Sequence, residues 1–160
     1  MNAFFASEDA FLVHYGDIVT DENFSKMLEY HQHRRALITL LVHRRSRSNS
    51  AMQLDTENRV LQFWERPEAE FWDSTPETWV NSGVLIASPE ILTAIPEGKS
   101  VDWPKDIFPK VLSTGRIFAY PLTGYRMAID SPERLERVRR DLSEEKYRPE
   151  ISTPHPPTGP

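Results

Sequence analysis

Compact apolar runs alternate with amphipathic stretches along most of this chain of 160 residues. The runs 11–15 and 36–42 are mainly apolar, which is typical of strands buried on both faces of a parallel sheet. Between them, apolar residues at helical spacing follow Thr20 and Asp21, which can cap a helix. A strand, a helix and a second strand within about 30 residues predict a right-handed βαβ unit.

The middle of the chain predicts a β-hairpin, because two short strand-like segments flank the turn-rich tetrapeptide 55–58. An acidic segment, predicted as a loop, follows at 67–77. The fold class is therefore α/β, with a mixed, mainly parallel sheet and an inserted β-hairpin. The predicted hairpin strands are 50–54 and 59–65, the later strands are 79–87, 116–122 and 125–129, and the later helices begin at 88, 104 and 131.

The composition indicates one globular domain. With 24 acidic and 19 basic residues, the net charge of −5 argues against nucleic acid as a partner. The chain contains no cysteine, which excludes disulfides and thiolate metal sites, and we expect a cytoplasmic protein. The first residues lack a basic n-region and no apolar run is long enough to span a bilayer, so we expect no membrane partner. Residues 148–160 are proline-rich and predict a disordered tail after a domain of residues 1–147.

Gly16 and Asp17 follow the first apolar run directly, at the carboxyl end of a predicted strand. Ligands of open α/β sheets bind beyond these strand ends. A glycine lets a ligand approach the backbone, and an aspartate can hold a hard cation such as Mg2+ through its oxygens. The alternative is that Asp17 only supports the turn into the following helix. The two residues alone do not decide between a site and a turn.

Two further polar groups lie where predicted strands end or begin. Glu65 and Arg66 stand side by side, and such a pair can bind sugar hydroxyls and contact a phosphate, or can form a surface ion pair. The tripeptide Asn81-Ser82-Gly83 combines an amide with a backbone that lacks a Cβ. It suits a hydroxylated ligand, or it forms a bulge at the start of a strand.

The histidines do not predict a metal site. His31 and His33 are two residues apart and point to different sides of a helix, so we interpret them as favourable charges at its C-terminus. The run 43–47 contains three arginines and could attract phosphate, although a solvated loop is the more frequent outcome of such a run.

Five segments occur in a family-like order, namely FLVHYGDIVTD, SNSAMQLDTENRVLQFWERP, WVNSGVLIASPEIL, DIFPKVL and GYRMAIDSPERLERV. Through them, residues 11–142 resemble the sugar-1-phosphate nucleotidyltransferase family, particularly enzymes that load mannose-, heptose- or glucose-1-phosphate onto a nucleotide. The resemblance implies a Rossmann-like fold of the nucleotide-diphospho-sugar transferase type. It also implies that a sugar-1-phosphate oxygen attacks the α-phosphorus of a nucleoside triphosphate, that pyrophosphate leaves, and that Mg2+ bridges the phosphates.

The resemblance also gives the candidate residues their roles. Asp17 matches a strand-end aspartate that binds metal, with Gly16 beside it where metal and phosphates would meet the sheet. Glu65 and Arg66 match an acid–lysine pair at the sugar and phosphate, with arginine replacing lysine. The sugar-contacting turn of the family is matched by Asn81 and Gly83.

The sequence departs from the family in two places. The glycine-rich nucleotide-binding loop of the family precedes the strand that here begins near residue 10, so we expect a partial domain, truncated at its N-terminus. The second metal aspartate of the family is replaced by Ala128. Asp130, two positions further on, is the candidate substitute and thus the second predicted Mg2+ ligand.

The leading hypothesis is the sugar-binding portion of a sugar-1-phosphate nucleotidyltransferase, which takes a nucleoside triphosphate once an N-terminal half completes it. The alternative is a non-catalytic sugar-phosphate-binding or regulatory module, or a remnant, derived from that family. A glycosyltransferase would need an Asp-x-Asp-like pair, which residues 14–17 do not supply. Without a neighbour, strand 11–15 would be an apolar sheet edge, so we expect a partner chain or self-association.

Overall fold

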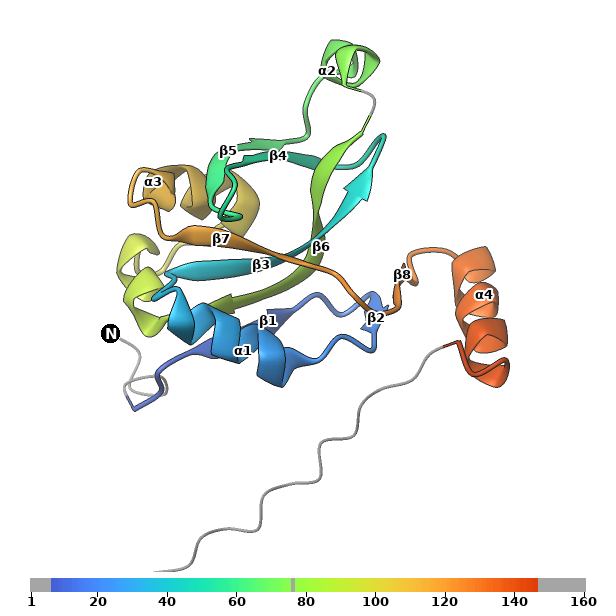
Figure 1. Cartoon of the computed structure of the whole chain (residues 1–160). Coiled ribbons are helices and arrows are strands. Elements are labelled where there is room, and N and C mark those ends of the chain that lie inside the picture. Colours follow the sequence, from blue (N-terminus) through green and yellow to red (C-terminus); the bar gives the residue numbers. More distant parts are fainter. Residues whose placement is uncertain (1–6, 76, 147–160) are drawn as a thin grey trace, which may run out of the picture.

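A mixed six-stranded sheet forms the centre of the molecule (Figure 1). The structure is a computed structural model and describes residues 7–75 and 77–146. The strand order is β5–β4–β6–β3–β7, and β1 also pairs with β6. The mixed α/β class and the hairpin of β4 and β5 are as predicted. The strands are β1 (Phe11–His14), β3 (Ile38–Arg45), β4 (Ser50–Leu54), β5 (Val60–Glu65), β6 (Thr78–Ala87) and β7 (Ile117–Pro121).

Strand β6 lies between β1 and β3 and runs antiparallel to both. Strands β1 and β3 therefore run in the same direction, and helix α1 (Phe24–His33) connects them, but they are not neighbours. The predicted βαβ unit is thus present with an additional strand inserted into it. The adjacent parallel pair in the described part of the chain is β3 and β7. The local pattern could not show this, because the inserted strand comes later in the sequence.

Strand β1 is at an edge of the sheet. Within the described ranges it pairs with β6 and with no strand on its other side. Its residues alternate between half-buried and exposed, and Leu12 is 44% exposed. Burial on both faces is therefore wrong for β1. It is right for β3, where Leu40 and Leu41 point to opposite faces and are both fully buried.

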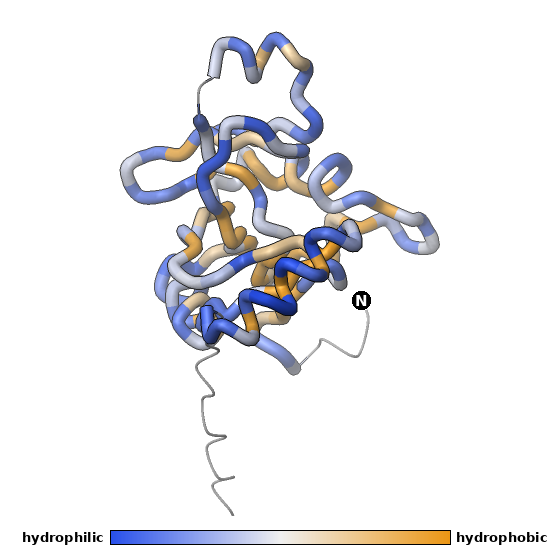
Figure 2. The backbone as a smooth tube through the Cα atoms, turned by 90° about the vertical axis from the view of Figure 1, so that its right-hand side faces the viewer, coloured by the Kyte–Doolittle hydropathy of each residue, from blue (hydrophilic) through white to orange (hydrophobic). Residues whose placement is uncertain are grey.

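Helices cover both faces of the sheet. Helix α1 packs on one face through Met27, in a cluster with Leu41 and Ile86. The larger core lies on the other face, where Phe108 is fully buried. Figure 2 shows apolar stretches concentrated in the central strands, with apolar and hydrophilic residues alternating along the helices. The elements over this second face are η2 (Pro89–Ala94), the π-helical turn η3 (Trp103–Ile107) and α3 (Phe108–Leu112).

The acidic segment predicted as a loop contains the short helix α2 (Ala69–Ser74). Trp72 of this helix packs with Ala51 and Val80 against the hairpin side of the sheet. The helix forms because this tertiary contact buries an indole, which outweighs the weak helical preference of so short a segment.

A separate two-stranded ribbon pairs β2 (Ile18–Thr20) with β8 (Arg126–Ala128) and precedes helix α4 (Pro132–Ser143). Strand β2 was not predicted, because three residues are too short to show a periodic pattern. In Figure 1, α4 lies beside β8 and outside the central sheet. The ribbon brings the chain after β1 next to the chain before α4.

None of the helices in the described part of the chain is long and apolar enough to cross a membrane. The predicted tail at 148–160 lies outside the described residues.

Candidate functional site

A bulge in β6 opens a cavity at the edge of the sheet. The β3–β6 register shifts there, because Leu40 pairs with Leu85 whereas Val42 pairs with Asn81. On the opposite side of β6, the N-terminal half pairs with β4 and the C-terminal half pairs with β1. The gap between these two neighbours forms a cavity of about 630 Å³, and the bulged residues line it.

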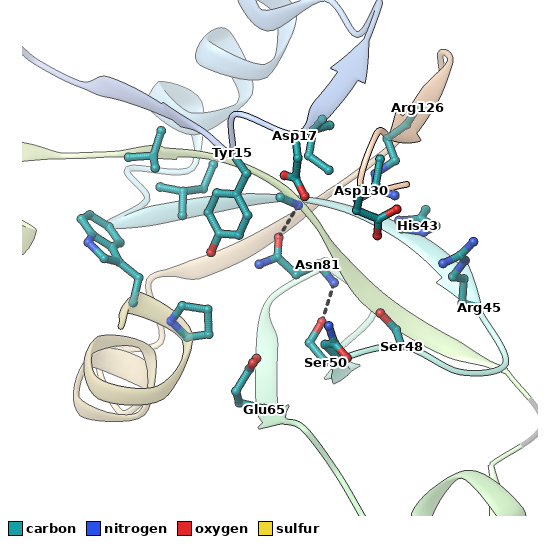
Figure 3. A pocket seen from close by; sticks show the side chains of 18 of the residues that line it. Tyr15, Asp17, His43, Arg45, Ser48, Ser50, Glu65, Asn81, Arg126 and Asp130 are labelled. Atoms are coloured by element: carbon teal, nitrogen blue, oxygen red, sulfur yellow. Dashed lines mark hydrogen bonds between the residues drawn. The ribbon is translucent and has the colours of Figure 1, made fainter. Parts of the chain in front are cut away.

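Polar residues from the ends of several strands line this cavity (Figure 3). Gly16 is not among them, and nothing lies within 4 Å of the position that its Cβ would take. At Gly83, by contrast, the side chains of Ile18 and Tyr15 pack close to the backbone. The sequence-predicted residues that do line the cavity are Asp17, Glu65, Arg66, Asn81, Gly83 and Asp130.

Asn81 and Gly83 form the bulge itself. The side-chain oxygen of Asn81 accepts a hydrogen bond from the Gly83 N–H at 3.0 Å, and the Asn81 N–H donates to Ser50 Oγ at 2.9 Å (Figure 3). Gly83 has a φ of +83°, and a Cβ there would lie 2.9 Å from Cγ1 of Ile18. The bulge interpretation is therefore right, and the same residues also line the cavity.

Asp17 lies at the cavity rim, in the turn after β1. The Tyr15 C=O accepts a hydrogen bond from the Ile18 N–H at 3.1 Å, and the Asp17 C=O accepts one from the Ile129 N–H at 2.7 Å. The turn is thus closed by backbone groups. Among the described residues, the exposed Asp17 carboxylate accepts no hydrogen bond, so its side chain does not hold the turn together.

We call Tyr15, Asp17, Glu65, Asn81 and Asp102 the acidic end of the cavity. Burial, followed by the negative charge of Asp102, raises the pKa of Glu65, whereas neighbouring Arg66 acts in the opposite direction. Burial also raises the pKa of Tyr15, and Asp102 and Glu65 add to that effect. The phenol therefore keeps its proton at neutral pH and can donate a hydrogen bond to a ligand.

Glu65 and Arg66 face the cavity unequally. Their side chains are 3.7 Å apart, and 21% of the Glu65 side chain is exposed against 80% of the Arg66 side chain. An exposed pair at this distance contributes little to stability. Arg66 is thus free to turn toward a phosphate while Glu65 stays in the cavity wall.

We call His43, Arg45 and Arg126 the cationic end. The alternation of side chains along β3 places His43 and Arg45 on the same face of that strand, and both line the cavity. Residues 43–45 thus belong to β3, so the solvated loop predicted for this run is wrong there. The reason is that β3 continues beyond its apolar part to pair with the first residues of β6.

Ser82 holds two members of the cationic end in place. The Arg126 Nε donates to the Ser82 carbonyl at 3.1 Å, and the His43 Nδ1 lies 2.8 Å from the Ser82 hydroxyl. Burial, followed by the charges of Arg126 and Arg45, lowers the pKa of His43 to about 4. The imidazole is therefore neutral at pH 7, and the two guanidinium groups carry the positive charge.

The family resemblance implies a Mg2+ ion, and such an ion requires oxygen ligands at this cavity. Across residues 7–75 and 77–146, no three His, Cys, Asp or Glu side chains are grouped so that they could hold a metal ion. Asp130 accepts two hydrogen bonds from Arg134, at 2.8 and 2.9 Å. Arg126 interacts electrostatically with Asp17 and Asp130, where its charge opposes a cation. A metal ion held by the protein alone therefore does not fit these residues, and Mg2+ bound through one or two carboxylates would depend on substrate phosphates.

Residues 20–22, two of them predicted as helix caps, tie the chain before β8 to the chain before α1. Buried Glu22 accepts hydrogen bonds from the Thr123 N–H at 2.8 Å and the Gly124 N–H at 3.2 Å. The Thr20 hydroxyl donates to the Tyr125 carbonyl at 2.7 Å. The cap of α1 is Asn23, so the predicted cap at Thr20 and Asp21 is wrong. Their polar groups bind distant backbone instead.

His31 does not act as a charged group at the end of a helix. It is 2% exposed, and its Nδ1 and Nε2 lie 2.8 Å from the Thr39 hydroxyl and 3.1 Å from the Ser88 hydroxyl. Burial, followed by the charge of Arg116, lowers its pKa to about 4. The helix-end interpretation is therefore wrong for His31, because residues far away in sequence enclose it as a neutral ring.

Comparison with known proteins shows the family of this chain and agrees with its fold. A family model described as Nucleotidyl transferase matches residues 1–125. The chain belongs to the nucleotidyl transferase family. The leading sequence hypothesis named a subgroup of this family, and the fold expected from that hypothesis is the one described above.

Sugar-phosphate enzymes are among the relatives of this nucleotidyl transferase. It is 28% identical to mannose-1-phosphate guanylyltransferase of Mycobacterium tuberculosis, over 84% of this chain and 37% of that protein. It is 29% identical to UTP–glucose-1-phosphate uridylyltransferase of Synechocystis sp., over 73% of this chain and 30% of that protein. The chain thus spans well under half the length of these relatives.

Solved structures show the same fold. HddC from Yersinia pseudotuberculosis matches with a TM-score of 0.66 and 20% identity, over 85% of this chain and 56% of that chain. The same protein complexed with GMP-PN matches with a TM-score of 0.67 and 19% identity, over 87% of this chain and 58% of that chain. The predicted nucleotide-diphospho-sugar transferase type of fold is confirmed.

Sequence reasoning missed Tyr15, Asp102 and Arg126 as members of the site. It noted Arg45 only as part of a basic run that could attract phosphate. Arg126 lies two positions before Ala128, so alternation along β8 places both on one face. That alternation was a usable signal for Arg126, as was the position of Tyr15 shortly before a predicted site residue. Asp102 lies in an irregular segment, and no local pattern indicates its position.

Proposed function

We propose that this chain forms the sugar-phosphate-binding part of a sugar-1-phosphate nucleotidyltransferase. The observation that carries the proposal is the convergence of Asp17, Glu65 and Asn81 on one cavity, from three separate segments of the chain. Glu65 and Asn81 each have an ordinary structural explanation, in an ion pair and in the bulge. Their convergence, in a family whose relatives include enzymes named for mannose 1-phosphate and glucose 1-phosphate, supports a shared ligand.

The two ends of the cavity suit the two parts of a sugar phosphate. Glu65, Asn81 and the Tyr15 phenol offer acceptors and donors for sugar hydroxyls. Arg66 and the cationic end offer charge-assisted hydrogen bonds to phosphate oxygens. In the proposed reaction, an oxygen of the sugar 1-phosphate forms a bond to the α-phosphorus of a nucleoside triphosphate. The bond to the β-phosphate oxygen breaks, and pyrophosphate leaves with the electron pair.

The role of this chain in that reaction is to bind and orient. Holding the sugar phosphate at both ends fixes the attacking oxygen, and a fixed nucleophile lowers the entropic part of the barrier. Guanidinium groups that face the phosphates stabilise the charge that develops during transfer. We assign no step to a protein-held metal ion, because the described side chains do not form a site for one.

The test has a binding arm and a reaction arm. Calorimetry with glucose 1-phosphate and mannose 1-phosphate should give saturable binding. Asp17→Ala should weaken it, because the Asp17 carboxylate at the acidic end accepts a hydrogen bond from a sugar hydroxyl in the proposed complex. Asp73→Ala, at an exposed position of α2, is the matched control and should leave binding unchanged. Addition of nucleoside triphosphates with Mg2+ then tests for release of pyrophosphate. The folded chain fails the proposal if neither sugar phosphate binds, or if Asp17→Ala and Asp73→Ala behave alike.

We further propose that the edge of β1 takes a strand from a nucleotide-binding half of the enzyme. The Tyr15 N–H donates to Gly83 O at 2.9 Å, so by the alternation of an antiparallel ladder the backbone groups of Leu12 and His14 face away from β6. Because these backbone groups are unpaired in the described part of the chain and apolar Leu12 is exposed beside them, the edge is suited to the addition of a strand. When this chain is studied alone, the open edge should pair with a second copy of the chain. Size-exclusion chromatography should therefore show self-association that Leu12→Lys reduces. A wild-type chain that stays monomeric at high concentration counts against the proposal.

A further inference from the structure

The cationic end continues into a smaller recess of about 280 Å³ behind the main cavity. Its lining includes His43, Arg45, Arg126 and Arg134. Arg134 is already engaged, because it forms a bidentate ion pair with Asp130. In the described part of the chain, Arg45 and Arg126 form no ion pair with any carboxylate. Two guanidinium groups therefore face one recess without a paired anion.

Arg126 is held in a partly buried position close to another cation. Its side chain is half-buried, and the Nε hydrogen bond to Ser82 fixes the direction of the guanidinium. Burial, followed by the charge of Arg45, lowers the pKa of Arg126, whereas Asp17 and Asp130 act in the opposite direction. Arg134 adds to the lowering. A partly desolvated cation beside another cation costs free energy unless an anion joins them. The geometry favours an oxyanion between the two side chains.

The neutral ring of His43 adds a polar group to the recess without adding charge. Its Nδ1 interacts with the Ser82 hydroxyl, and His43 lines both the main cavity and the recess. Planar guanidinium forks bind phosphate oxygens in pairs, and a neutral imidazole can add a hydrogen bond. In the described part of the chain, no three His, Cys, Asp or Glu side chains are grouped here so that they could hold a metal ion.

We propose that Arg45 and Arg126, with His43 beside them, bind a phosphate or pyrophosphate group directly and without a divalent metal ion. Guanidinium charge then occupies the region where the family resemblance implies a second metal aspartate, at Ala128. The subsite depends on the proposed function only for the identity of the molecule that carries the phosphate.

Calorimetry with inorganic pyrophosphate, in EDTA and in Mg2+, tests this subsite on the whole chain. Binding should persist in EDTA, and Arg126→Gln and Arg45→Gln should each weaken it about tenfold. Arg44→Gln is the matched control. Arg44 follows His43 on the opposite face of β3, pairs with Glu77 at 2.8 Å and does not line the cavity, so pyrophosphate affinity should stay within about twofold of wild type.

Each outcome decides for or against the subsite. Binding that requires Mg2+, or an Arg126→Gln effect no larger than that of Arg44→Gln, overturns it, as does absence of binding to the folded chain. If Arg126→Gln does not fold, the variant Arg45→Gln at an exposed position decides the question. Arg126→Lys keeps the charge without the fork and should recover only part of the affinity.

The same titrations separate this inference from the proposed function. Pyrophosphate binding in EDTA together with no binding of glucose 1-phosphate or mannose 1-phosphate would sustain the subsite and reject the sugar-phosphate proposal. Sugar-phosphate binding together with no pyrophosphate binding, or with pyrophosphate binding that is insensitive to Arg126→Gln and Arg45→Gln, would do the reverse. Competition of each sugar phosphate and of a nucleoside triphosphate against pyrophosphate then shows which molecule supplies the phosphate.

Discussion

The two ends of the cavity are built in different ways. The acidic end collects side chains from loops and strand ends around the bulge, and its charges are partly shielded by Arg66. The cationic end stands on two strands, β3 and β8, and its charges face one another without an anion. The first arrangement suits neutral, hydroxylated ligands that need oriented hydrogen bonds, and the second suits a dense negative charge. The difference indicates a ligand with a sugar-like part and a phosphate.

The largest effect is expected where the two ends meet, at Gly83. Gly83→Ala should lower the free energy of unfolding by about 2–4 kcal/mol, because it combines a left-handed φ with a Cβ forced against Ile18. Gly98→Ala is the control, since Gly98 also has a positive φ, of +70°, but has nothing within 4 Å of its Cβ position. Urea unfolding of both variants measures the difference. Equal losses would mean that the contact with Ile18 is unimportant.

Glu65→Gln tests the acidic end alone. The charge of Glu65 strengthens hydrogen bonds from sugar hydroxyls, so its loss should weaken binding of glucose 1-phosphate or mannose 1-phosphate by about tenfold. Binding of inorganic pyrophosphate should stay within about twofold, because the cationic end remains intact. Glu68→Gln, on the exposed residue before α2, serves as the control. A parallel loss of both ligands would show that the two ends are not distinct.

Tyr15→Phe should have a smaller effect on the same end. Removal of one neutral hydroxyl is expected to reduce sugar-phosphate affinity by about two- to tenfold and to leave the fold unchanged. The comparison is Tyr30→Phe, whose hydroxyl donates to the Ala119 carbonyl at 3.3 Å and does not line the cavity. Calorimetry should then show no change for Tyr30→Phe. A weaker effect of Tyr15→Phe than of Tyr30→Phe would remove Tyr15 from the site.

The smallest effect concerns buried His31 and half-buried His43. His31 and His43 both have a pKa lowered to about 4, below the value of about 6.5 in the unfolded chain. The unfolded state therefore binds more protons between these values, and native stability should fall as the pH is lowered from about 6.5 to about 4. His43→Gln should reduce that fall, as measured by urea unfolding at several pH values.

Pyrophosphate should separate the two histidines. An anion beside His43 favours its protonated form, so NMR titration should show its pKa rise by up to about one unit, while that of enclosed His31 stays constant. Equal shifts at both rings would indicate a general effect of the salt rather than binding at the cationic end.

The sequence was sufficient for those parts of the site that lie at strand ends. Asp17, Glu65 and Asn81 each follow or begin a clear apolar pattern, and strand ends are where ligands of such sheets bind. Arg45 and Arg126 were harder, because their importance comes from facing each other across strands that are distant in sequence. His31 shows the same limit. Nothing beside it in the chain indicates that Thr39 and Ser88 supply the hydroxyls that enclose it.

The fold could likewise be predicted where the pattern is local and not where it depends on contacts between distant segments. Long apolar runs predicted β3 and β6 and the order of elements, while β2 and α2 depend on contacts with remote segments. The edge position of β1 also could not be read from its composition. A run of apolar residues shows that a strand prefers burial, and only the neighbours decide whether both faces receive it.

The buried Glu22 carboxylate connects the segments that carry the acidic end and the cationic end of the cavity. It binds the backbone at Thr123 and Gly124, just before Arg126, while Glu22 itself lies shortly after Asp17. The Glu22 side chain therefore helps to set the distance between Asp17 and the Arg126 guanidinium. A ligand that binds at one end then meets the other end at a fixed distance. Loss of the Glu22 carboxylate would make the segments that carry Asp17 and Arg126 more mobile.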